Sequence, residues 1–354
     1  MPKPKVHIFQ PVDETGASHE RLRSAGVDVK VPEMHWSQMA NLKTTYDQEF
    51  DLDTVVGVGV ASRTVMVPQK SLDMAPKMRM LAFYSVGYDC VDIEAATERG
   101  VLVVHSPTES NWGGVAEGTV ANMLAIMKKV REKDRHVKSG GWRDNALRGN
   151  FLGSRHMDNF PGLTLGIIGL GRIGGRVADL MAPWRMRMIG FDPYVDESIH
   201  VHHNVKKVDF ETVLRESDII TLHCNLTRET RGLIGAAQLK LMKKTAILCN
   251  QARGPIVDVE ALAEALQNEQ IAAAALDVLP EEPPKKDHPL LGLGDKVLLS
   301  PHMISNNLGT GLQMAVPWVE QAIIDVLHGK VPRHVVNPDA LPTWEAKYGG
   351  RSLL

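Results

Sequence analysis

Short runs of apolar residues alternate with helical patterns along most of the chain, and this alternation predicts the fold. The predicted strands of the first hundred residues are KVHIF (5–9), VVGVGV (55–60), MRMLAF (78–83) and VLVVH (101–105). Those of a second set are TLGIIG (164–169), MRMIGF (186–191), IITLHC (219–224), TAILCN (245–250), IAAAALDV (271–278) and KVLLS (296–300). Apolar runs without polar alternation are typical of strands that helices cover on both faces of a parallel sheet. We therefore predict an α/β protein with two doubly wound parallel sheets.

Helical patterns fill the intervals between these strands. A helix is expected near residues 18–25, another ends at Gly100, and a longer one runs from about Val115 to Val130. Residues 135–162 break the rhythm, because they hold five glycines and Pro161. We expect an irregular excursion there, which could serve as a lid, a linker or an arm across a subunit interface. A last helix is expected near 311–328, before a polar tail for which the sequence suggests no structure.

Composition narrows the possible functions. The 354 residues suggest about two domains, and the 40 basic and 42 acidic residues nearly cancel. Without an excess of either charge, we expect no nucleic-acid partner and no membrane surface. The apolar runs are too short to cross a bilayer, and the N-terminus lacks the apolar stretch of a signal peptide. Three scattered cysteines without a CxxC pair favour reduced thiols in the cytoplasm.

The strongest local signal is the motif GLGRIG (169–174). Alone it indicates only a glycine-rich turn, but here it follows an apolar strand and opens a helical stretch. Gly169 would permit a tight turn, Gly171 would let a pyrophosphate approach the backbone, and Gly174 would let the helix pack against the strand. The N–H groups and the dipole at the start of the helix would attract the phosphates. We therefore predict a Rossmann-like dinucleotide site.

A second apolar strand ends at Asp192, 18 residues after the last glycine of the motif. A carboxylate there can accept hydrogen bonds from both ribose hydroxyls and would repel a 2′-phosphate. The predicted cofactor is therefore NAD rather than NADP.

Charged residues follow three later strands, where ligands bind in such sheets. Arg253 follows TAILCN, Asp277 and Glu282 follow IAAAAL, and His302 follows KVLLS. Each alone is typical of a solvated loop residue. Together, at successive strand ends beside a nucleotide site, they supply the groups that oxidation of a hydroxy acid needs. No metal site is expected, and the HxHH run (200–203) is interpreted as a solvated loop.

At this point the sequence resembles the NAD-dependent D-isomer-specific 2-hydroxyacid dehydrogenases over roughly residues 50–330. The resemblance rests on VGYDCVDI, GGVAEGTVANMLA, GLGRIGGRVA, FDPY, HCNLTRETRGLIG, LMKKTAILCNQARGPIVD, ALDVLPEEP and SPH, in that order. It implies that Arg253 clamps the carboxylate and carbonyl oxygen of a substrate, for which its planar fork is suited. It implies further that His302 is the general acid–base group and that Glu282 pairs with the imidazole.

The resemblance also assigns binding residues. Val86, Gly87 and Ser305 would contact the substrate, which would be a small 2-oxo or 2-hydroxy acid. The cofactor residues would be Gly169, Gly171, Arg172, Ile173, Gly174, Asp192, Cys224, Asn225, Gln251, Ala252 and Asp277.

The resemblance changes the expected domain organisation as well. The substrate domain would be discontinuous and comprise residues 1–104 and 303–354, with an NAD-binding domain of residues 105–302 inserted between them. A homodimer is expected, with residues 115–130 and 135–160 at the interface. Trp142 would either pack in that interface or reach the neighbouring active site.

Some positions depart from the family pattern and leave the substrate open. Asn225 stands where many members have Pro, and Met303–Asn307 follow the histidine where small residues are common. The ASRT run (61–64) differs from the Arg-Ser of the phosphoglycerate-specific branch, so a phosphorylated substrate is not clearly supported. Glu282 disfavours formate oxidation, for which members carry Gln, and AFYSVGYDC lacks the Lys of phosphite oxidation. An NAD-sensing protein of the corepressor type, which keeps the Arg, Glu and His, is the alternative to an enzyme.

Overall fold

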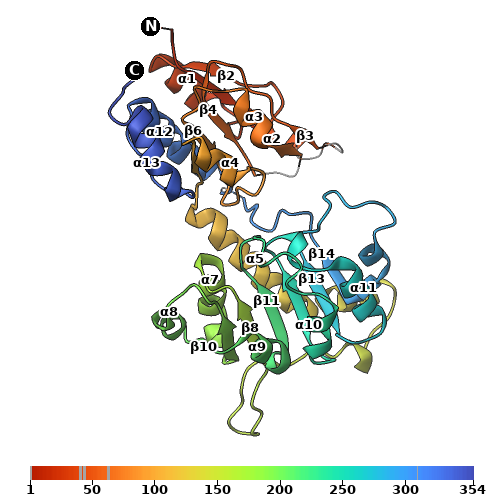
Figure 1. Cartoon of the computed structure of the whole chain (residues 1–354). Helices are drawn as coiled ribbons and strands as arrows, with labels where there is room; N and C mark the ends of the chain where they lie inside the picture. Colours follow the sequence, from red (N-terminus) through yellow and green to blue (C-terminus); the bar gives the residue numbers. More distant parts are fainter. Residues whose placement is uncertain (1, 40–41, 43–44, 62–63, 309) are drawn as a thin grey trace. The chain divides into compact units, whose positions relative to one another are not determined.

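The computed structural model describes every residue except 1, 40–41, 43–44, 62–63 and 309, so Ser62 and Arg63 of the ASRT run lie outside the described residues. The chain divides into two compact units. Unit 1 consists of Met1–Asn111 and Asn307–Leu354, and unit 2 consists of Trp112–Asn306. Each unit has its own parallel sheet with helices on both faces (Figure 1). The predicted α/β fold class is confirmed.

The main sheet of unit 1 has the strand order β2-β1-β4-β6-β7, and all its neighbours pair in parallel. Its strands are β1 (Lys5–Ile8), β2 (Asp28–Lys30), β4 (Thr54–Gly59), β6 (Met80–Phe83) and β7 (Leu102–Val104). A small second sheet pairs β3 (Tyr46–Asp47) with β5 (Val65–Met66). The helices of this unit are α1 (Ala17–Ser24), α2 (Trp36–Met39), α3 (Gln69–Asp73), α4 (Ile93–Glu98), α12 (Val316–Leu327) and α13 (Leu341–Tyr348).

Helices from the two ends of the chain cover the same face of the unit 1 sheet. Side chains of α1, α12 and α13 form one apolar core with β1, β4, β6 and β7, while α3 and α4 pack on the other face. The sequence suggested no structure for the polar tail after residue 328, and the structure shows that this segment contains α13. Only Trp344 of that helix is fully buried, and its Nε1 donates to the Arg79 carbonyl oxygen at 3.0 Å. Leu341 and Tyr348 pack partly buried against the same core, so the apolar side chains of α13 recur at helical spacing, a signal that the sequence analysis did not use.

The chain before α13 is tied to the edge strand β7. The Val336 N–H donates to the Val103 carbonyl oxygen at 2.9 Å, and the Val103 N–H donates to Asn337 Oδ1 at 2.8 Å. The Asn337 amide nitrogen donates to the Val101 carbonyl oxygen at 2.9 Å. These bonds satisfy the open edge of β7, so the C-terminal segment completes the unit 1 sheet.

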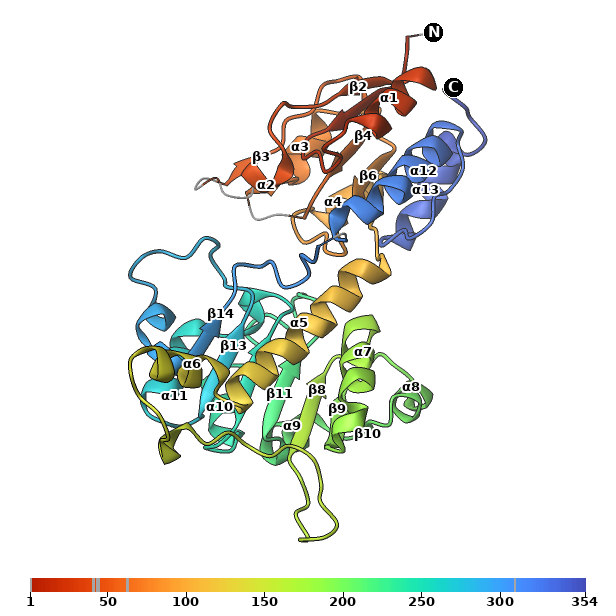
Figure 2. The same ribbon diagram turned by 180° about the vertical axis from the view of Figure 1, so that it is seen from behind.

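The sheet of unit 2 has the strand order β10-β9-β8-β11-β12-β13-β14, again entirely parallel. Its strands are β8 (Thr164–Ile168), β9 (Arg187–Phe191), β10 (Lys206–Lys207), β11 (Ile219–Leu222), β12 (Ile247–Asn250), β13 (Ala273–Leu276) and β14 (Val297–Leu299). The helices are α5 (Glu109–Met127), whose residues from Trp112 onward belong to this unit, α6 (Val130–Lys138), α7 (Arg172–Met181), α8 (Glu197–His202), α9 (Phe210–Glu216), α10 (Ala236–Leu241) and α11 (Val259–Gln267). Helices α5 and α7 cover one face, seen in Figure 2, and α9, α10 and α11 cover the other.

Two details of the expected helices were wrong. The long helix begins at Glu109, six residues before Val115, and the break expected from residue 135 begins only after α6. Helix α6 has the sequence VREKDRHVK and no buried side chain, so it lacks the apolar face that would have revealed it. The segment after it contains one short 3-10 turn, Asn145–Leu147, and the bridge between Arg155 and Phe160.

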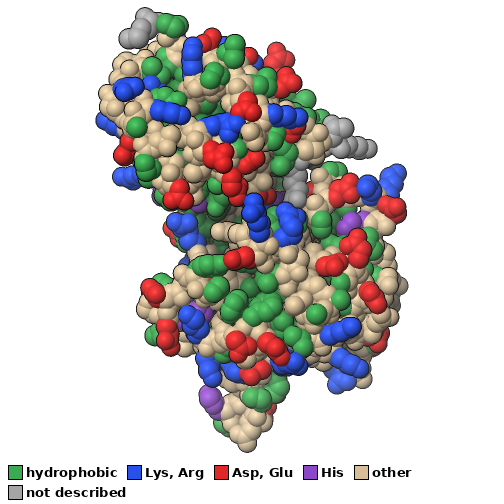
Figure 3. Space-filling view, in the orientation of Figure 1, with side chains coloured by type: hydrophobic (Ala, Val, Ile, Leu, Met, Phe, Trp, Pro, Cys, Tyr) green, Lys and Arg blue, Asp and Glu red, His purple; other side chains and the backbone are tan. Residues whose placement is uncertain are grey.

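Among the described residues, no helix is both long and apolar enough to cross a membrane. On the face shown in Figure 3, acidic and basic side chains are intermingled over each unit. This pattern agrees with the net charge of -2.

A buried histidine makes the stability of unit 1 depend on pH. His7 of β1 is 7% exposed and makes edge contacts with the rings of Phe9 and Phe50, at centroid distances of 6.4 and 5.8 Å. Burial lowers its pKa to about 4, Lys30 and Lys5 add to this effect, and Asp51 opposes it. The folded protein therefore binds a proton at His7 less readily than the unfolded chain does.

We predict that stability falls as the pH drops from about 6.5 towards 4, because the unfolded chain takes up the proton first. At pH 5 the loss from His7 should be about 2 kcal/mol relative to neutral pH. The His7→Phe variant should lack this part of the loss, as measured by urea unfolding at pH 7.5 and 5. The exposed His328→Phe serves as the control, and equal losses in wild type and His7→Phe would contradict the assignment.

Candidate active site at the carboxyl end of the unit 2 sheet

Six adjacent strands of unit 2 deliver the predicted site residues to one edge of the sheet. Because the strands are parallel, the residue after each strand lies at the same edge. In spatial order these residues are Asp192 after β9, Gly169 after β8, Cys224 beyond β11, Arg253 beyond β12, Asp277 after β13 and His302 beyond β14. Asp192 and the glycine motif thus lie at one end of the row, and His302 lies at the other.

The glycine motif forms the turn between β8 and α7. Gly169 has a φ of 89°, and a Cβ there would lie 2.7 Å from the Cys224 nitrogen. A Cβ on Gly174 would lie 2.0 Å from the Gly169 carbonyl oxygen. A Cβ on Gly171 would meet nothing within 4 Å. Packing within the protein therefore requires the first and third glycines, whereas the second leaves open space at the start of the helix.

This open space has the character of an anion site. Gly171 caps α7 without a side chain, so no cap side chain occupies the first N–H groups of the helix. Arg172 is exposed beside them, and Ile173 is half-buried. The unpaired N–H groups and the helix dipole both favour a phosphate at this position.

Asp192 is joined to the glycine motif by its own carboxylate. Its Oδ2 accepts from the Leu170 N–H at 2.8 Å, and its Oδ1 accepts from the Tyr194 N–H at 2.9 Å. The side chain therefore fixes the turn and places a negative charge beside it. Such a charge suits two ribose hydroxyls and opposes a 2′-phosphate.

Three further candidates lie along the same edge. Burial, with a smaller contribution from Asp192, raises the pKa of the Cys224 thiol to about 11, so the thiol is neutral. Asn225 is exposed, and its carbonyl oxygen accepts from Thr230 Oγ1 at 2.6 Å. Gln251 donates to the Ala275 carbonyl oxygen at 3.1 Å, but its buried Oε1 has no partner within the described part of the chain. That unsatisfied acceptor and the open space at Gly171 fit a dinucleotide such as NAD.

His302 and Glu282 form a directly bonded pair. His302 Nδ1 lies 2.7 Å from Glu282 Oε2, and Glu282 Oε1 accepts from the Leu279 N–H at 2.8 Å. The histidine is more exposed than the carboxylate, with 39% and 19% of the side chains accessible. A proton on Nδ1 donated to the carboxylate leaves Nε2 as the atom that can exchange a proton with a bound molecule.

Asp277 holds the backbone that carries His302. Its Oδ1 accepts from Ser300 Oγ at 2.6 Å and from the Met303 N–H at 3.2 Å. Its Oδ2 accepts from the Ile304 N–H at 3.3 Å, and its carbonyl oxygen accepts from the His302 N–H at 2.8 Å. These bonds hold His302 at a φ of 54°, in the left-handed region that non-glycine residues rarely adopt. Burial raises the pKa of the Asp277 carboxyl, against the opposing effects of Ser300 and His302.

Arg253 lies in a loop that a buried amide shapes. The Asn250 side chain accepts from the Ala252 N–H at 3.1 Å and donates to the Arg253 carbonyl oxygen at 2.9 Å. Arg253 Nη1 donates to the Ala252 carbonyl oxygen at 2.8 Å. Sequence reasoning missed Asn250 and Ser300 as supports, although each is a polar residue at the end of an apolar run. That position was the available signal.

The remaining predicted substrate residues are placed as follows. Val86 and Gly87 follow β6 in unit 1, whereas the half-buried Ser305 belongs to unit 2.

The HxHH run does not form the solvated loop that was expected, because His200 is buried in α8 and His203 Nδ1 lies 2.7 Å from Asp179 Oδ1. In the part of the chain that the structure describes, no group of three His, Cys, Asp or Glu side chains could hold a metal ion.

Comparison with protein-family models gives a match over residues 120–303 to the NAD binding domain of D-isomer specific 2-hydroxyacid dehydrogenases. A glyoxylate reductase of Thermofilum pendens is 35% identical over 345 residues, which cover 96% of each chain. A D-3-phosphoglycerate dehydrogenase of Archaeoglobus fulgidus is 36% identical over 333 residues. The present chain spans 59% of the length of that second relative.

Comparison with solved structures supports the fold. A glyoxylate reductase from Paecilomyes thermophila superposes with a TM-score of 0.79 and 23% identity, over 95% of this chain and 99% of the other. At that identity the likeness concerns the fold alone.

The role of Asp192 can be tested by the Asp192→Ala variant. Removing the carboxylate removes an acceptor for the ribose and the anchor of Leu170, so the KM for NADH should rise about tenfold. The preference for NADH over NADPH should fall at the same time, because the repulsion of the 2′-phosphate is lost. Initial rates with both cofactors measure this, with the exposed Asp196→Ala as the control. An unchanged ratio between the cofactors would place the ribose elsewhere.

Proposed function

The chain belongs to the D-isomer specific 2-hydroxyacid dehydrogenase family, a class of NAD-dependent oxidoreductases, and we propose that it reduces a small 2-oxo acid to the 2-hydroxy acid. Glyoxylate is the first candidate, because several relatives are named glyoxylate reductases. The observation that carries the proposal is the 2.7 Å contact between His302 and Glu282 at the strand end beside the cofactor residues.

The proposed roles of the site residues follow the order of the strand ends along the unit 2 sheet. Bound NADH supplies the hydride that reduces the carbonyl carbon. The N-terminus of α7 and Asp192 hold the phosphate and ribose groups of the cofactor, and Gln251 supplies an acceptor further along the edge. Asp277, whose oxygens are bonded by the loop of His302, links the cofactor side of the site to the acid–base group.

Arg253 and His302 act on the oxygen atoms of the substrate. The Arg253 guanidinium carries a permanent charge and donates in a planar fork, so it can bind the carboxylate and stabilise charge that develops on the carbonyl oxygen. His302 Nε2 donates a proton to that oxygen during reduction and accepts it during oxidation. Glu282 holds the ring and stabilises its protonated form. Val86 and Gly87 bind the carboxylate through their N–H groups, which makes unit 1 the substrate domain.

The first experiment is an NADH-oxidation screen at neutral pH. The panel runs from glyoxylate, hydroxypyruvate and pyruvate to branched and aromatic 2-oxo acids. Clear turnover of small members supports the proposal and identifies the substrate. Tight NADH binding without turnover of any acid would contradict it and favour the NAD-sensing alternative.

We predict that His302→Ala lowers kcat by about a thousandfold, which is within the usual contribution of a general acid–base group. The Kd of NADH should stay within about twofold, because the histidine acts on the substrate. Stopped-flow turnover and fluorescence titration of NADH separate the two effects. His202→Ala, an exposed histidine of the same unit, is the control. Normal turnover of His302→Ala would remove it from the mechanism.

We further propose that the enzyme is a cytoplasmic homodimer whose interface includes the segment after α6. In that segment Trp142, Phe151 and Met157 are 74%, 51% and 100% exposed, although all three are apolar. Arg155 lies over the rings of Phe151 and Phe160, at 4.4 and 4.7 Å, which gives the exposed segment a fixed shape. Exposed apolar side chains on one ordered segment favour burial against a second copy.

Sedimentation velocity tests the dimer. The wild type should sediment at twice the chain mass of 39.0 kDa, and Met157→Glu combined with Trp142→Glu should shift the protein to the monomer, because two charges would be buried in an apolar interface. Leu52→Glu changes an exposed apolar residue of unit 1 and should leave the dimer intact. A monomeric wild type would contradict the proposal.

A further inference from the structure

We infer that His105 is a positioning residue for the carboxylate of the substrate. Its ring fixes the Val86 carbonyl, and this directs the Gly87 N–H towards the anion. The inference rests on the proposed function, which assigns the carboxylate to the loop after β6. The proposed role was not recognised from the sequence, where His105 stood only as the last residue of a predicted strand.

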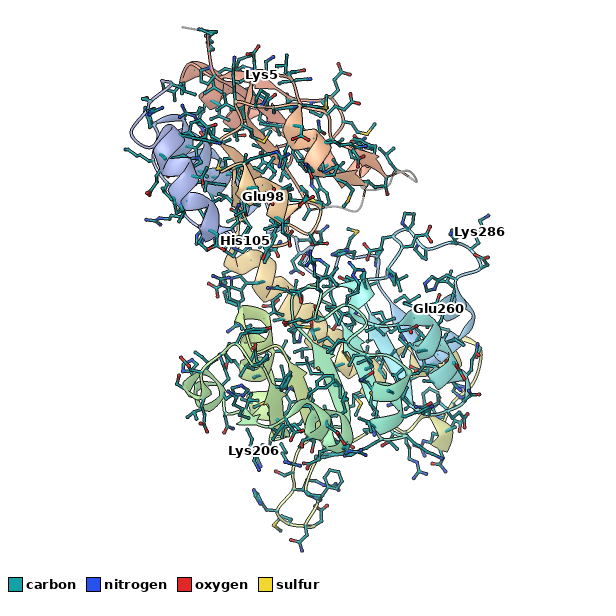
Figure 4. The ribbon with its side chains drawn as sticks, viewed as in Figure 1. Lys5, Glu98, His105, Lys206, Glu260 and Lys286 are labelled. Carbon is teal, nitrogen blue, oxygen red and sulfur yellow. The ribbon has the colours of Figure 1, made fainter. Side chains whose placement is uncertain are left out.

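His105 and the carboxylate-binding loop occupy neighbouring strand ends in unit 1. The loop follows β6, His105 follows β7, and these two strands pair in parallel. Figure 4 shows His105 at this edge of the unit. His105 Nδ1 lies 2.7 Å from the Val86 carbonyl oxygen, which can only accept a hydrogen bond. The proton must therefore be on Nδ1, and the ring acts as a donor to the loop.

Fixing this carbonyl also fixes the direction of the next N–H. Among the described residues the only cis peptide bond joins Glu282 and Pro283, so the bond between Val86 and Gly87 is trans. In a trans peptide the N–H points opposite to the carbonyl of the same peptide plane. With the Val86 oxygen bonded to His105, the Gly87 N–H points away from the ring. Neither Val86 nor Gly87 donates its N–H to another group in the described chain.

Ser85 fixes the second carbonyl of the loop. Its hydroxyl donates to the Gly87 carbonyl oxygen at 3.0 Å and accepts from the Ala61 N–H at 2.9 Å. Its own carbonyl oxygen accepts from the Ser106 N–H at 3.1 Å. Two side chains, Ser85 and His105, thus bind two successive carbonyl groups, and the donors of the loop remain for a ligand. Oriented N–H groups of this kind form anion-binding sites.

Aromatic rings hold the imidazole of His105 in place. The Tyr88 ring meets it edge-on at 5.9 Å, and the His334 ring lies at 6.3 Å. His334 is stacked on Trp318 at 4.9 Å with an interplanar angle of 12°, and its carbonyl oxygen accepts from the His105 N–H at 3.3 Å. His334 has a φ of 62°, a left-handed conformation that places both its ring and its carbonyl against His105. The rings therefore fix the direction of the Nδ1 donor.

This role predicts which kinetic constant changes. The Gly87 N–H binds the carboxylate, which has the same charge in the substrate and in the transition state. Loss of its orientation should therefore raise the KM of the 2-oxo acid and leave kcat nearly unchanged. An asparagine should restore binding, because its amide nitrogen is bonded to Cγ as Nδ1 is and can donate to the same oxygen.

The test compares His105→Leu, His105→Asn and Ser85→Ala with the wild type, using the 2-oxo acid that the wild type turns over best. His105→Leu should raise the KM about tenfold, Ser85→Ala should raise it as well, and His105→Asn should return it to within about threefold of the wild type. The values of kcat and the Kd of NADH should stay within about twofold of the wild type in all three. His328→Leu, which removes a ring that bonds Ser352 in the same unit, is the control.

Unchanged KM values in both His105→Leu and Ser85→Ala would overturn the inference. A fall in kcat at constant KM would do so too, since it would indicate a role in the chemical step. If circular dichroism shows that His105→Leu is unfolded, His105→Asn and Ser85→Ala decide the question: a wild-type KM in Ser85→Ala, or a KM raised tenfold in His105→Asn, overturns it. A wild type that turns over no 2-oxo acid overturns the proposed function together with the inference.

Discussion

Parallel pairing of the strands is the constraint on which both candidate sites depend. In unit 2 the pairs Ile168 with Leu222, Leu222 with Asn250, and Asn250 with Leu276 are in register, so these strands end level with one another. The loops that follow these strands therefore begin at the same level, at the carboxyl edge of the sheet. A slip of a single residue in one strand would turn every side chain beyond it to the opposite face. Backbone hydrogen bonds within the sheet thus set the order of the site residues before any side chain contributes.

Buried and half-buried polar side chains then fix the loops that follow the strands. Asn250 bonds both sides of the Arg253 loop, Asp277 binds three groups around His302, and Ser85 and His105 bind two carbonyls in unit 1. Asn250 and Asp277 are buried, whereas Ser85 and His105 are half-buried, and a shielded polar group costs free energy if it loses its partner. The loops are consequently held in one conformation, which is the requirement for donors and acceptors that must meet a small ligand within a fraction of an ångström.

The sequence was sufficient for the parts of the structure that repeat a strong pattern. Long apolar runs predicted the strands, because strands that are buried on both faces consist mainly of apolar residues. The GLGRIG motif predicted the start of α7. Helix α6 was missed because it has no buried side chain. Helix α13 was missed although Leu341, Trp344 and Tyr348 lie at helical spacing and pack on the unit 1 core. The candidate residues could be named by motif. Their supports could not, because Asp277 with Ile304, or His105 with Val86, are contacts that only the folded backbone creates.

The composition of unit 1 from both ends of the chain has a consequence for synthesis on the ribosome. The strands β1 to β7 emerge first, but α12 and α13, which cover one face of their sheet, follow only after Trp112–Asn306 has been made. At roughly 5–20 residues per second, that inserted unit takes about 10–40 s to translate. During this interval the apolar face that includes Val6, Val56 and Met80 has no cover from its own C-terminal helices. The nascent N-terminal segment thus carries an incompletely covered apolar face while unit 2, whose residues are contiguous in the sequence, is being translated.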